Sequence, residues 1–361
     1  MKAVPLRFGI LKKRNGSEEK KMIRFYVGVD LHRNNFTYCM RLKNGEEKMG
    51  KLAIRELKGF ARMLGKHAAV AVEATGNTWM FCQEMKEKVG RLVVVNPTQF
   101  KVISRSTKKT DKHDARILAE YLEKDMLPEV RMKDGLQSKI SSLTQTREKL
   151  VQLRTVLKNK INNLFASRFI ELRREELSSE KGLLKVLACR FDPITDTELR
   201  VMVNEIRSLN KSIDELDRTI EENGSKMDGF DNLKSIKGIG SKGAATLLSV
   251  IGKIEDFRSA KQLAAYIGIV PRVSDSNDTS HHGRITKLGS KIARTILVQC
   301  SLVAKRYSPY LHRFHESVKS RRGGAKANIA LARKFLEIIY KTLKNNWIFE
   351  DFTKFKLAEN N

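Results

Sequence analysis

The chain has 361 residues, of which 41% are apolar, and its 70 Lys and Arg against 41 Asp and Glu give a formal net charge of +29 at pH 7. This composition excludes an intrinsically disordered tail, a collagen-like fibre and a disulfide scaffold, and the length suggests two or three domains. The positive charge indicates a polyanionic partner, and nucleic acid is favoured because neutralised phosphates release counterions. A peripheral membrane protein is the competing interpretation. No lipid anchor or long apolar span supports it, so we expect no membrane partner.

The cysteines indicate a reduced, cytoplasmic protein, which with this charge we expect to be associated with the nucleoid. The four cysteines are Cys39, Cys82, Cys189 and Cys300. They are far apart in the chain and form no Cys-x-x-Cys pair or Cys/His cluster, which argues against a zinc site and against disulfides. Residues 1–22 are rich in Lys and Arg but lack the apolar run of a signal peptide. We interpret them as a basic arm.

Residues 23–130 predict an α/β domain. Apolar runs rich in β-branched residues predict strands over 23–32, 36–42, 48–54, 68–75 and 91–96. Helical periodicity covers 54–64, 78–89 and 111–123. Three strands in a meander, followed by helix, strand, helix, strand and helix, are typical of an RNase H-like (RuvC-like) fold.

Residues 134–226 predict a helical coiled-coil arm. Apolar residues recur at heptad spacing from Leu136 to Leu164 and again from Leu199 to Ile220, with Arg147 and Arg154 at two seam positions. A break at Asp192-Pro193 precedes the second run. Two interpretations stay open, an antiparallel hairpin within one chain and a dimerisation element.

A third, helical domain is predicted over residues 230–345, followed by a tail over 346–361. Its segment NLKSIKGIGSKGAATLLSVIG places Gly238, Gly240 and Gly243 between two helical stretches, as in a helix-hairpin-helix. There the backbone N–H groups at a helix N-terminus contact phosphates without reading sequence. Gly238, Gly240 and Lys242 are therefore candidate nucleic-acid contacts; an ordinary helix turn is the alternative.

Four carboxylates stand at informative positions in the α/β domain. Asp30 ends the first strand, Glu73 ends the fourth, and Asp111 and Asp114 lie three residues apart at the start of a helix, on one face. In an RNase H-like sheet these elements meet at one edge, where four anions require divalent cations. Oxygen ligands suit Mg²⁺ or Mn²⁺, and two ions about 4 Å apart would clamp a phosphodiester. The alternatives are a helix cap or a dipole-complementing acid for Asp111 and a surface residue for Glu73. His113 is expected to point away from the metals.

Several segments together resemble a known family. YVGVDLH, VEATG and KTDKHDARILA resemble the DEDD motifs of the Piv-type transposases, the recombinases of the IS-one-ten and IS-eleven-eleven groups of insertion sequences. SIKGIGSKGAATLLSVIG, AAYIGIVPRVSDSNDTSHHGRITKLGSKIARTIL and GGAKANIALARKFLEIIY are similar to that family's C-terminal transposase domain. The resemblance runs in order from residue 23 to about residue 345.

The resemblance implies a serine nucleophile. In PRVSDSNDTSHHGRITK the matching residue is Ser276, with Asn277 where the family usually has glycine; Ser274 and Ser280 are the alternatives. A serine hydroxyl needs a base or a metal to attack; the metal cluster is the natural activator, and His281 and His282 are the neighbouring bases. The resemblance further implies a composite site of both domains, a covalent DNA–serine bond, and a noncoding bridge RNA that selects target and donor DNA.

The C-terminal stretch supports an extended nucleic-acid contact. Residues 305–344 contain eleven Lys or Arg and two Glu, more charge than solubility requires, although a solvated helix face is the alternative. We expect contacts from Arg321, Arg322 and Lys326, and we place Arg284 and Lys287, beside the serine segment, nearest the scissile phosphate.

The sequence thus predicts a DEDD/serine DNA recombinase that cuts and rejoins strands to insert and excise a mobile element. Strand exchange between two duplexes needs several active sites, so we expect a homo-oligomer, a dimer or a tetramer. Two alternatives are a RuvC-like structure-specific endonuclease that uses water and a non-catalytic nucleic-acid-binding protein.

Overall fold

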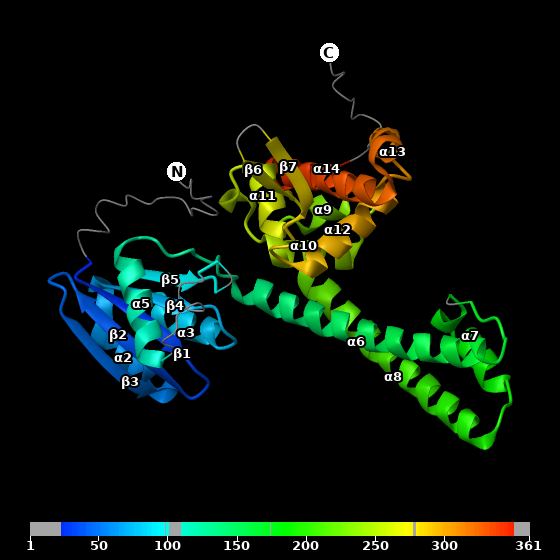
Figure 1. Ribbon diagram of the computed structural model, residues 1–361, viewed down its shortest axis with the longest axis horizontal. Helices are drawn as coiled ribbons and strands as arrows, with labels where there is room; N and C mark the ends of the chain where they lie inside the picture. The colour runs from blue at the N-terminus through cyan, green and yellow to red at the C-terminus, as the bar shows by residue number, and fades with distance from the viewer. Residues whose placement is uncertain (1–22, 98, 101–109, 174, 277–278, 350–361) are drawn as a thin grey trace, which may run out of the picture. The chain divides into compact units, whose positions relative to one another are not determined.

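A computed structural model of the chain describes residues 23–97, 99, 100, 110–173, 175–276 and 279–349, with only the backbone over 273–282. The chain divides into two compact units, residues 1–132 and 133–361, and we describe each by itself (Figure 1). The predicted basic arm, and all but the first residues of the predicted tail, lie outside the described residues.

The first unit is built on a five-stranded sheet in the order β3-β2-β1-β4-β5. β1 pairs antiparallel with β2 and β2 with β3, whereas β1–β4 and β4–β5 are parallel. The five strands follow one another along the chain as predicted from the sequence, and their ends differ from the predicted ones by at most two residues. The strands are β1 (Phe25–Leu31), β2 (Asn35–Leu42), β3 (Glu47–Ala53), β4 (Ala68–Glu73) and β5 (Arg91–Val95).

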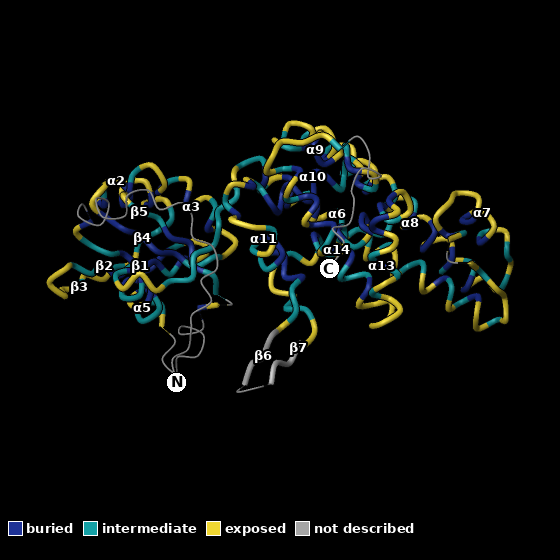
Figure 2. The backbone as a smooth tube through the Cα atoms, turned by 90° about the horizontal axis from the view of Figure 1, so that it is seen from above, coloured by how far each residue is buried: buried dark blue, intermediate teal, exposed yellow. Residues whose placement is uncertain are grey.

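Helices cover both faces of this sheet. The alternation along β4 explains how: Val70 and Val72 pack in the cluster that contains Phe60 of α2 and Phe81 of α3, whereas Ala69 packs in the cluster that contains residues of α5. Figure 2 shows the buried strands between these layers. The helices are α2 (Leu57–Leu64), preceded by a 3-10 turn at Ile54–Glu56, α3 (Thr78–Met85) and α5 (Asp111–Glu123).

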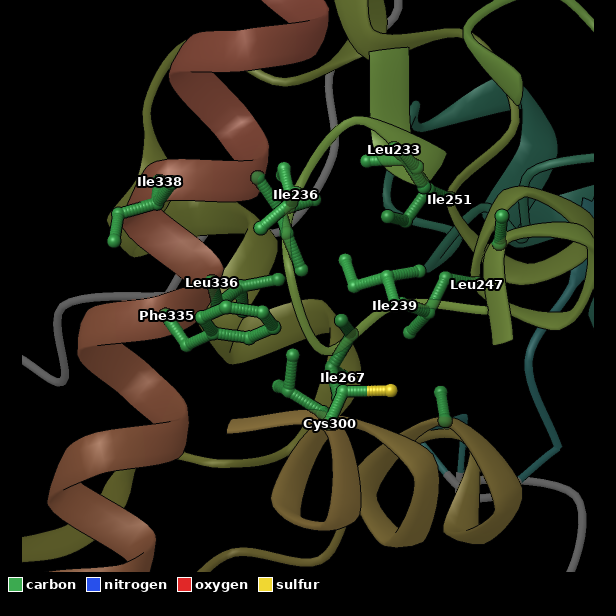
Figure 3. Close-up of a cluster of buried hydrophobic side chains, with 14 of the residues drawn as sticks. Leu233, Ile236, Ile239, Leu247, Ile251, Ile267, Cys300, Phe335, Leu336 and Ile338 are labelled. Carbon is green, nitrogen blue, oxygen red and sulfur yellow. The ribbon is translucent and has the colours of Figure 1, made fainter. Parts of the chain in front are cut away.

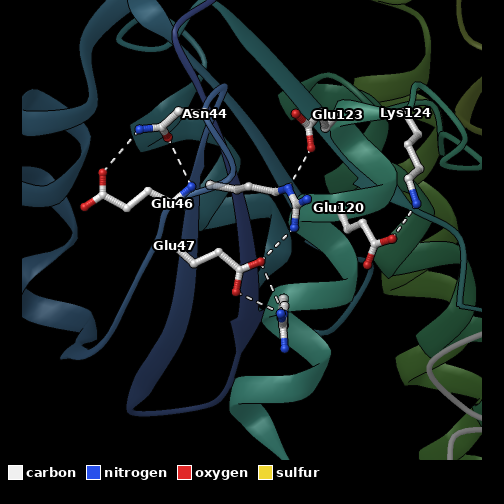
Figure 4. Close-up of polar contacts among 8 residues, drawn as sticks. Asn44, Glu46, Glu47, Glu120, Glu123 and Lys124 are labelled. Atoms are coloured by element: carbon white, nitrogen blue, oxygen red, sulfur yellow. Dashed lines mark hydrogen bonds and ion pairs between the residues drawn. The ribbon is translucent and has the colours of Figure 1, made fainter.

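Charged side chains at the rim of the sheet fix α5 against β2 and β3 (Figure 4). Arg41 of β2 donates to Glu123 of α5 and to Glu47 of β3, each at 2.7 Å. Arg116 of α5 reaches the same Glu47 carboxylate at 3.0 Å. Arg41, Glu47 and Glu123 are partly buried and Arg116 is exposed. Because the charges form a network, it fixes the position of α5 more firmly than isolated surface pairs would.

The second unit contains the predicted arm, formed by two 32-residue helices, α6 (Gly135–Ala166) and α8 (Pro193–Gly224). They run antiparallel, since Arg147 of α6 pairs with Asp217 and Arg154 with Asn210, further toward the start of α8. The two arginines of the predicted seam thus make polar contacts across it. α7 (Glu180–Ala188) packs at the far end, and Asp192 caps α8 with Pro193 in its first turn. This pairing is a hairpin within one chain; dimerisation stays a prediction.

The rest of the second unit is a helical domain around one apolar core, to which Leu233, Ile251, Ile267, Phe335 and Leu336 contribute (Figure 3). Ile140 and Ile220 of the arm belong to the same core, so the base of the arm is part of this domain. Its elements are α9 (Phe230–Lys234), α10 (Ser241–Ile251), α11 (Ala260–Ile267), β6 (Pro271–Ser276), β7 (Thr279–Ile285), α12 (Lys291–Ala304), α13 (Pro309–Arg322) and α14 (Gly324–Lys344).

The serine segment differs from the flexible loop that its polar composition suggests. β6 and β7 form a two-stranded antiparallel hairpin with a register shift between Pro271 and Val273. Among the described residues, no helix is long and apolar enough to cross a membrane.

Candidate active site

The sheet brings Asp30 and Glu73 to the same edge. β1 and β4 are parallel neighbours, and Val29 pairs with Val72 at the last pair of their register. Asp30 and Glu73 are the next residues on the two strands, where the strands leave the apolar interior. The side chain of Asp30 is 19% exposed, so a carboxylate there is largely removed from water.

Helix α5 adds the other two carboxylates. Thr110 caps the helix by accepting a hydrogen bond from the His113 amide, so Asp111 is its first residue and not its cap. Asp111 and Asp114 both lie in the first turn, where the helix dipole favours negative charge. Gly28 of β1 allows the helix to come this close, because a Cβ there would lie 2.0 Å from the carbonyl oxygen of Ala115.

A histidine and a lysine contact these carboxylates. His32 Nε2 lies 3.2 Å from Asp30 Oδ2 and 3.3 Å from Asp111 Oδ1, and Lys51 Nζ lies 3.2 Å from Asp111 Oδ2. One ligand atom each from Asp30, His32 and Asp111 lies within 4.8 Å of the others, close enough to surround one cation. Neither His32 nor Lys51 was among the residues predicted from the sequence. Strand alternation could have indicated His32, which stands two residues after Asp30.

The pKa values show that the carboxylates affect one another. Burial raises the pKa of Asp30, with further increases from Asp111 and Asp114, while His32 opposes the rise. Burial also raises the pKa of Glu73, with added repulsion from Asp30 and Asp114. The hydrogen bond from Lys51 lowers the pKa of Asp111. Repulsion thus couples Asp30 to Asp111 and Asp114, and Glu73 to Asp30 and Asp114, although among the described residues the close group of ligand atoms contains only Asp30, His32 and Asp111. A cation would reduce this repulsion.

The predicted nucleophile occupies the end of the hairpin in the second unit. Ser276 is the last residue of β6 and pairs with Thr279, while the alternatives Ser274 and Ser280 pair with His281 and Asp275. Asn277, the departure from the family pattern, lies outside the described residues. The hairpin thus places all three serines on two short paired strands.

Two family models match the chain. A DEDD transposase model of the IS110 group matches residues 27–170, and the model described as the transposase IS116/IS110/IS902 family matches residues 230–316. The chain belongs to the IS110 family of transposases. It is therefore a transposase or recombinase that acts on DNA, and the first match confirms the predicted RNase H-like fold of the first unit.

Individual relatives match nearly the whole chain. A probable family 20 transposase of Pseudomonas aeruginosa is 26% identical, over 91% of this chain and 96% of the relative. The transposase for insertion sequence element IS1111A of Coxiella burnetii is 25% identical over 93% of each chain. The pilin gene-inverting protein of Moraxella lacunata is 26% identical, over 91% of this chain and 98% of the relative. The similarity therefore extends over both units.

The side chains in the candidate site of the first unit are suitable ligands for the divalent metal that an IS110-family transposase would use. The DEDD domain suggests a divalent metal, and the residues present supply two close carboxylates and an imidazole nitrogen within reach of one ion. Carboxylate oxygens are preferred by Mg²⁺ and Mn²⁺, and imidazole is better suited to Mn²⁺ than to Mg²⁺.

The predicted cations near the hairpin are exposed. Arg284 belongs to β7, and Lys287 follows it in the loop to α12. Lys287 has a φ of 56°, in the left-handed region that is unfavourable for a residue with a Cβ. Its N–H donates to the carbonyl of Gly268 at 3.1 Å, which helps to hold this conformation. The loop is therefore held in place by a backbone hydrogen bond to the end of α11.

The predicted helix-hairpin-helix residues have different surroundings. Gly238, with φ of 103°, packs on α12, because a Cβ there would lie 2.7 Å from the amide nitrogen of Ala304. A Cβ on Gly240, the N-cap residue of α10, would meet nothing within 4 Å, so this helix start is accessible. Lys242 Nζ lies 3.1 Å from Asp217 Oδ2, in an ion pair that the sequence did not indicate. Arg321, Arg322 and Lys326 are exposed around the turn between α13 and α14.

Proposed function

We propose that this IS110-family transposase is a DNA recombinase that cuts and rejoins strands to insert and excise a mobile element. The observation that supports the proposal is the cluster of ligand atoms from Asp30, His32 and Asp111, which lie within 4.8 Å of one another, and the repulsion that couples Asp30 to Asp111 and Asp114 and couples Glu73 to Asp30 and Asp114. Such a cluster is costly without cations, and phosphodiester chemistry is a reaction for which enzymes use carboxylate-bound metal pairs.

In this proposal Asp30, Glu73, Asp111 and Asp114 hold Mg²⁺ or Mn²⁺, and His32 borders the same site. Bound there, the cation would supply Lewis-acid activation of the serine hydroxyl and of the scissile phosphate. Lys51 balances part of the charge on Asp111. The side chain of Asp30 is 19% exposed, so it is only partly accessible to water.

Ser276 is the proposed nucleophile. Its Oγ would form a bond to phosphorus as the bond from phosphorus to the leaving strand oxygen breaks; the hydroxyl proton leaves, and the leaving oxygen takes up a proton. The phosphodiester energy is conserved in the serine ester, so a strand hydroxyl can reverse the step without ATP. His281 and His282 are the nearest histidines in the sequence, and Arg284 and Lys287 are proposed to bind the phosphate.

We further propose a noncoding bridge RNA as the guide for target and donor DNA, and a homo-oligomer as the working form. The net charge of +29 suits an RNA partner in addition to DNA. Gly238, Gly240, Lys242, Arg321, Arg322 and Lys326 are the proposed contacts away from the cleavage site. Exchange between two duplexes requires more than one set of catalytic groups, which supports a dimer or a tetramer.

The deciding experiment is a search for a covalent protein–DNA adduct on denaturing gels with labelled DNA, the bridge RNA and Mn²⁺. We expect the adduct in the parent protein and in Ser274→Ala and Ser280→Ala. Ser276→Ala should bind DNA and RNA normally yet form none. An undiminished adduct in Ser276→Ala would move the nucleophile elsewhere. Cleavage without any adduct in the parent would favour the RuvC-like endonuclease, and binding without cleavage the non-catalytic alternative.

A further inference from the structure

A pocket of about 630 Å³ lies where α12 ends and α13 begins, and no residue of the carboxylate site or of the hairpin lines it. It is lined by residues 305–309 together with His312 and Arg313. Lys305, Arg306 and Arg313 contribute cationic side chains, and none of these lining residues is acidic. A concave surface with one sign of charge attracts anionic ligands.

The pocket also presents an aromatic ring to solvent. Tyr307 is 55% exposed, so its ring is not part of the apolar core. Lys237, from the turn between α9 and α10, holds its ammonium 5.9 Å from the centre of that ring. Gly238 lets this turn pack on the end of α12, since its Cβ would otherwise meet Ala304. An exposed ring flanked by cations is the arrangement on which nucleic-acid bases stack.

The cations differ in their availability. Lys305 Nζ lies 3.2 Å from His315 Nδ1 and 3.8 Å from Glu316, so its charge is partly engaged. Within the described part of the chain, no hydrogen bond or ion pair occupies the exposed side chains of Arg306, His312 and Arg313. These three groups can therefore meet a phosphate without first breaking an internal contact.

The floor of the pocket is fixed. Ser308 is buried and caps α13, accepting a hydrogen bond from the Leu311 amide at 3.2 Å, and Pro309 occupies the first turn. The positions of Tyr307 and His312 thus follow from a helix start with a defined geometry. A fixed platform loses little conformational entropy when a ligand binds.

We propose that this pocket binds one unpaired nucleotide of a nucleic-acid strand, with its base stacked on Tyr307 and its flanking phosphates on Arg306 and Arg313. A base inside a duplex cannot use the site, because its faces are already covered by its neighbours. The shared chemistry is a phosphodiester with an exposed base, which single-stranded DNA and single-stranded RNA both supply. The inference is independent of the metal and of Ser276.

The direct test is photocrosslinking of the full-length protein to short strands that carry one 5-iodouracil, as DNA and as RNA, followed by peptide mapping. We expect a crosslink to the peptide that contains Tyr307 with at least one of the two strands, and the reactive strand identifies the source of the nucleotide. Crosslinks confined to other peptides, with both strands, would overturn the proposal.

Affinity measurements by fluorescence anisotropy supply the second test. Tyr307→Ala should weaken binding of the reactive single strand by about 5- to 150-fold, while Tyr307→Phe, which retains the ring, stays within about twofold of the parent. Arg306→Ala should make the log–log salt dependence shallower by about 0.7. Because Tyr307 is exposed, these changes leave the core intact.

Trp347→Ala is the matched control, since Trp347 is another exposed aromatic residue of the same unit, at 47%. Trp347→Ala should leave the affinity for the single strand unchanged. Tyr307→Ala should leave the affinity for a blunt-ended duplex unchanged. Equal losses for Tyr307→Ala and Trp347→Ala, or equal losses on duplex and single strand, would refute stacking on Tyr307.

Discussion

Replacing Asp30 by Asn should stabilise the metal-free protein while abolishing its chemistry. The ligand atoms of Asp30 and Asp111 lie within 4.8 Å. Two unit charges at that separation repel by about 0.9 kcal/mol at the dielectric constant of water and by about 3.5 kcal/mol at an effective value near 20. His32 and Lys51 offset part of this repulsion and solvent screens more of it. We therefore expect a net gain of about 1 kcal/mol for Asp30→Asn, at the low end of this range.

The gain in stability from Asp30→Asn depends on pH. Because the pKa of Asp30 is raised in the folded state, the native protein holds this proton more tightly than the unfolded chain does. The charge on Asp30 therefore lowers stability as pH rises through the interval between the unfolded and the folded pKa. The gain from Asp30→Asn should be full above that interval and absent below it.

Adding metal should make the parent protein more stable than Asp30→Asn, the reverse of their order without metal. A cation at 100 times its dissociation constant stabilises the fold by about 2.7 kcal/mol, and Asp30→Asn removes one of its ligands. In a Trp347→Phe background, Trp79 is the single remaining tryptophan and reports on the first unit. In EDTA, we expect the first unit to unfold at a temperature roughly 3 to 5 °C higher in Asp30→Asn than in the parent. On addition of Mn²⁺, the unfolding temperature of Asp30→Asn should rise less than that of the parent.

The matched control is Glu84→Gln. Glu84 lies on α3 of the same unit and pairs with Lys88 at 3.2 Å, outside the carboxylate site. Its loss should cost up to about 0.5 kcal/mol and leave the response to Mn²⁺ unchanged. DNA cleavage should fall by orders of magnitude in Asp30→Asn and should be unchanged in Glu84→Gln. A lower unfolding temperature for Asp30→Asn in EDTA, or an Mn²⁺ response equal to that of the parent, would refute the shared site.

Three further predictions address packing, the arm and nucleic-acid binding. Gly28→Ala should destabilise the first unit by roughly 1–3 kcal/mol and impair cleavage without touching a carboxylate, because its Cβ would lie 2.0 Å from the Ala115 oxygen; Gly59→Ala, with nothing within 4 Å, should be neutral or stabilising in the same thermal melts. Asp217→Asn should cost the second unit roughly 1–3 kcal/mol at neutral pH in urea unfolding. Burial works to raise the pKa of Asp217, but Arg147 and Lys242 outweigh it and lower that pKa, so this cost should disappear as pH falls through the folded value; an undiminished cost in acid would contradict the ion pair. Nucleic-acid affinity should drop by at least ~10³ between about 50 and 200 mM salt if six or more phosphates are neutralised, and a flat response would point to another kind of partner.

The strands could be predicted from local patterns in the sequence, and the four carboxylates were proposed from the same kind of pattern; the structure places ligand atoms of two of them, Asp30 and Asp111, close together. An acid that ends an apolar strand must lie at a sheet edge, and parallel pairing of β1 with β4 then brings Asp30 and Glu73 together. The spacing of Asp111 and Asp114 depends only on helix geometry. The strand ends and the helical spacing are local features, whereas the pairing of β1 with β4 is a distant contact that was expected from the RNase H-like order of elements.

Contacts between distant elements were beyond sequence reasoning. Lys51 reaches Asp111 because β3 pairs with β2, and nothing in the local sequence of β3 marks Lys51 among the other lysines. Lys242 appeared to be a cation free for DNA, but Asp217 of α8 faces it across the helix contact. The β6–β7 hairpin has the composition of a loop, and its pairing depends on strand partners whose polar residues give no apolar alternation.

The close approach of α5 to β1 connects packing to metal binding. Gly28 and the small side chains of Cys39, Ala115 and Ala119 allow the helix backbone to lie directly on the strand. The same approach buries Asp30 and brings Asp111 and Asp114 near it, so the packing that stabilises the unit also creates the repulsion. A cation relieves that repulsion only while α5 is seated. Metal binding and the seating of α5 must therefore reinforce each other, and residues such as Gly28 that never touch the metal should affect its affinity.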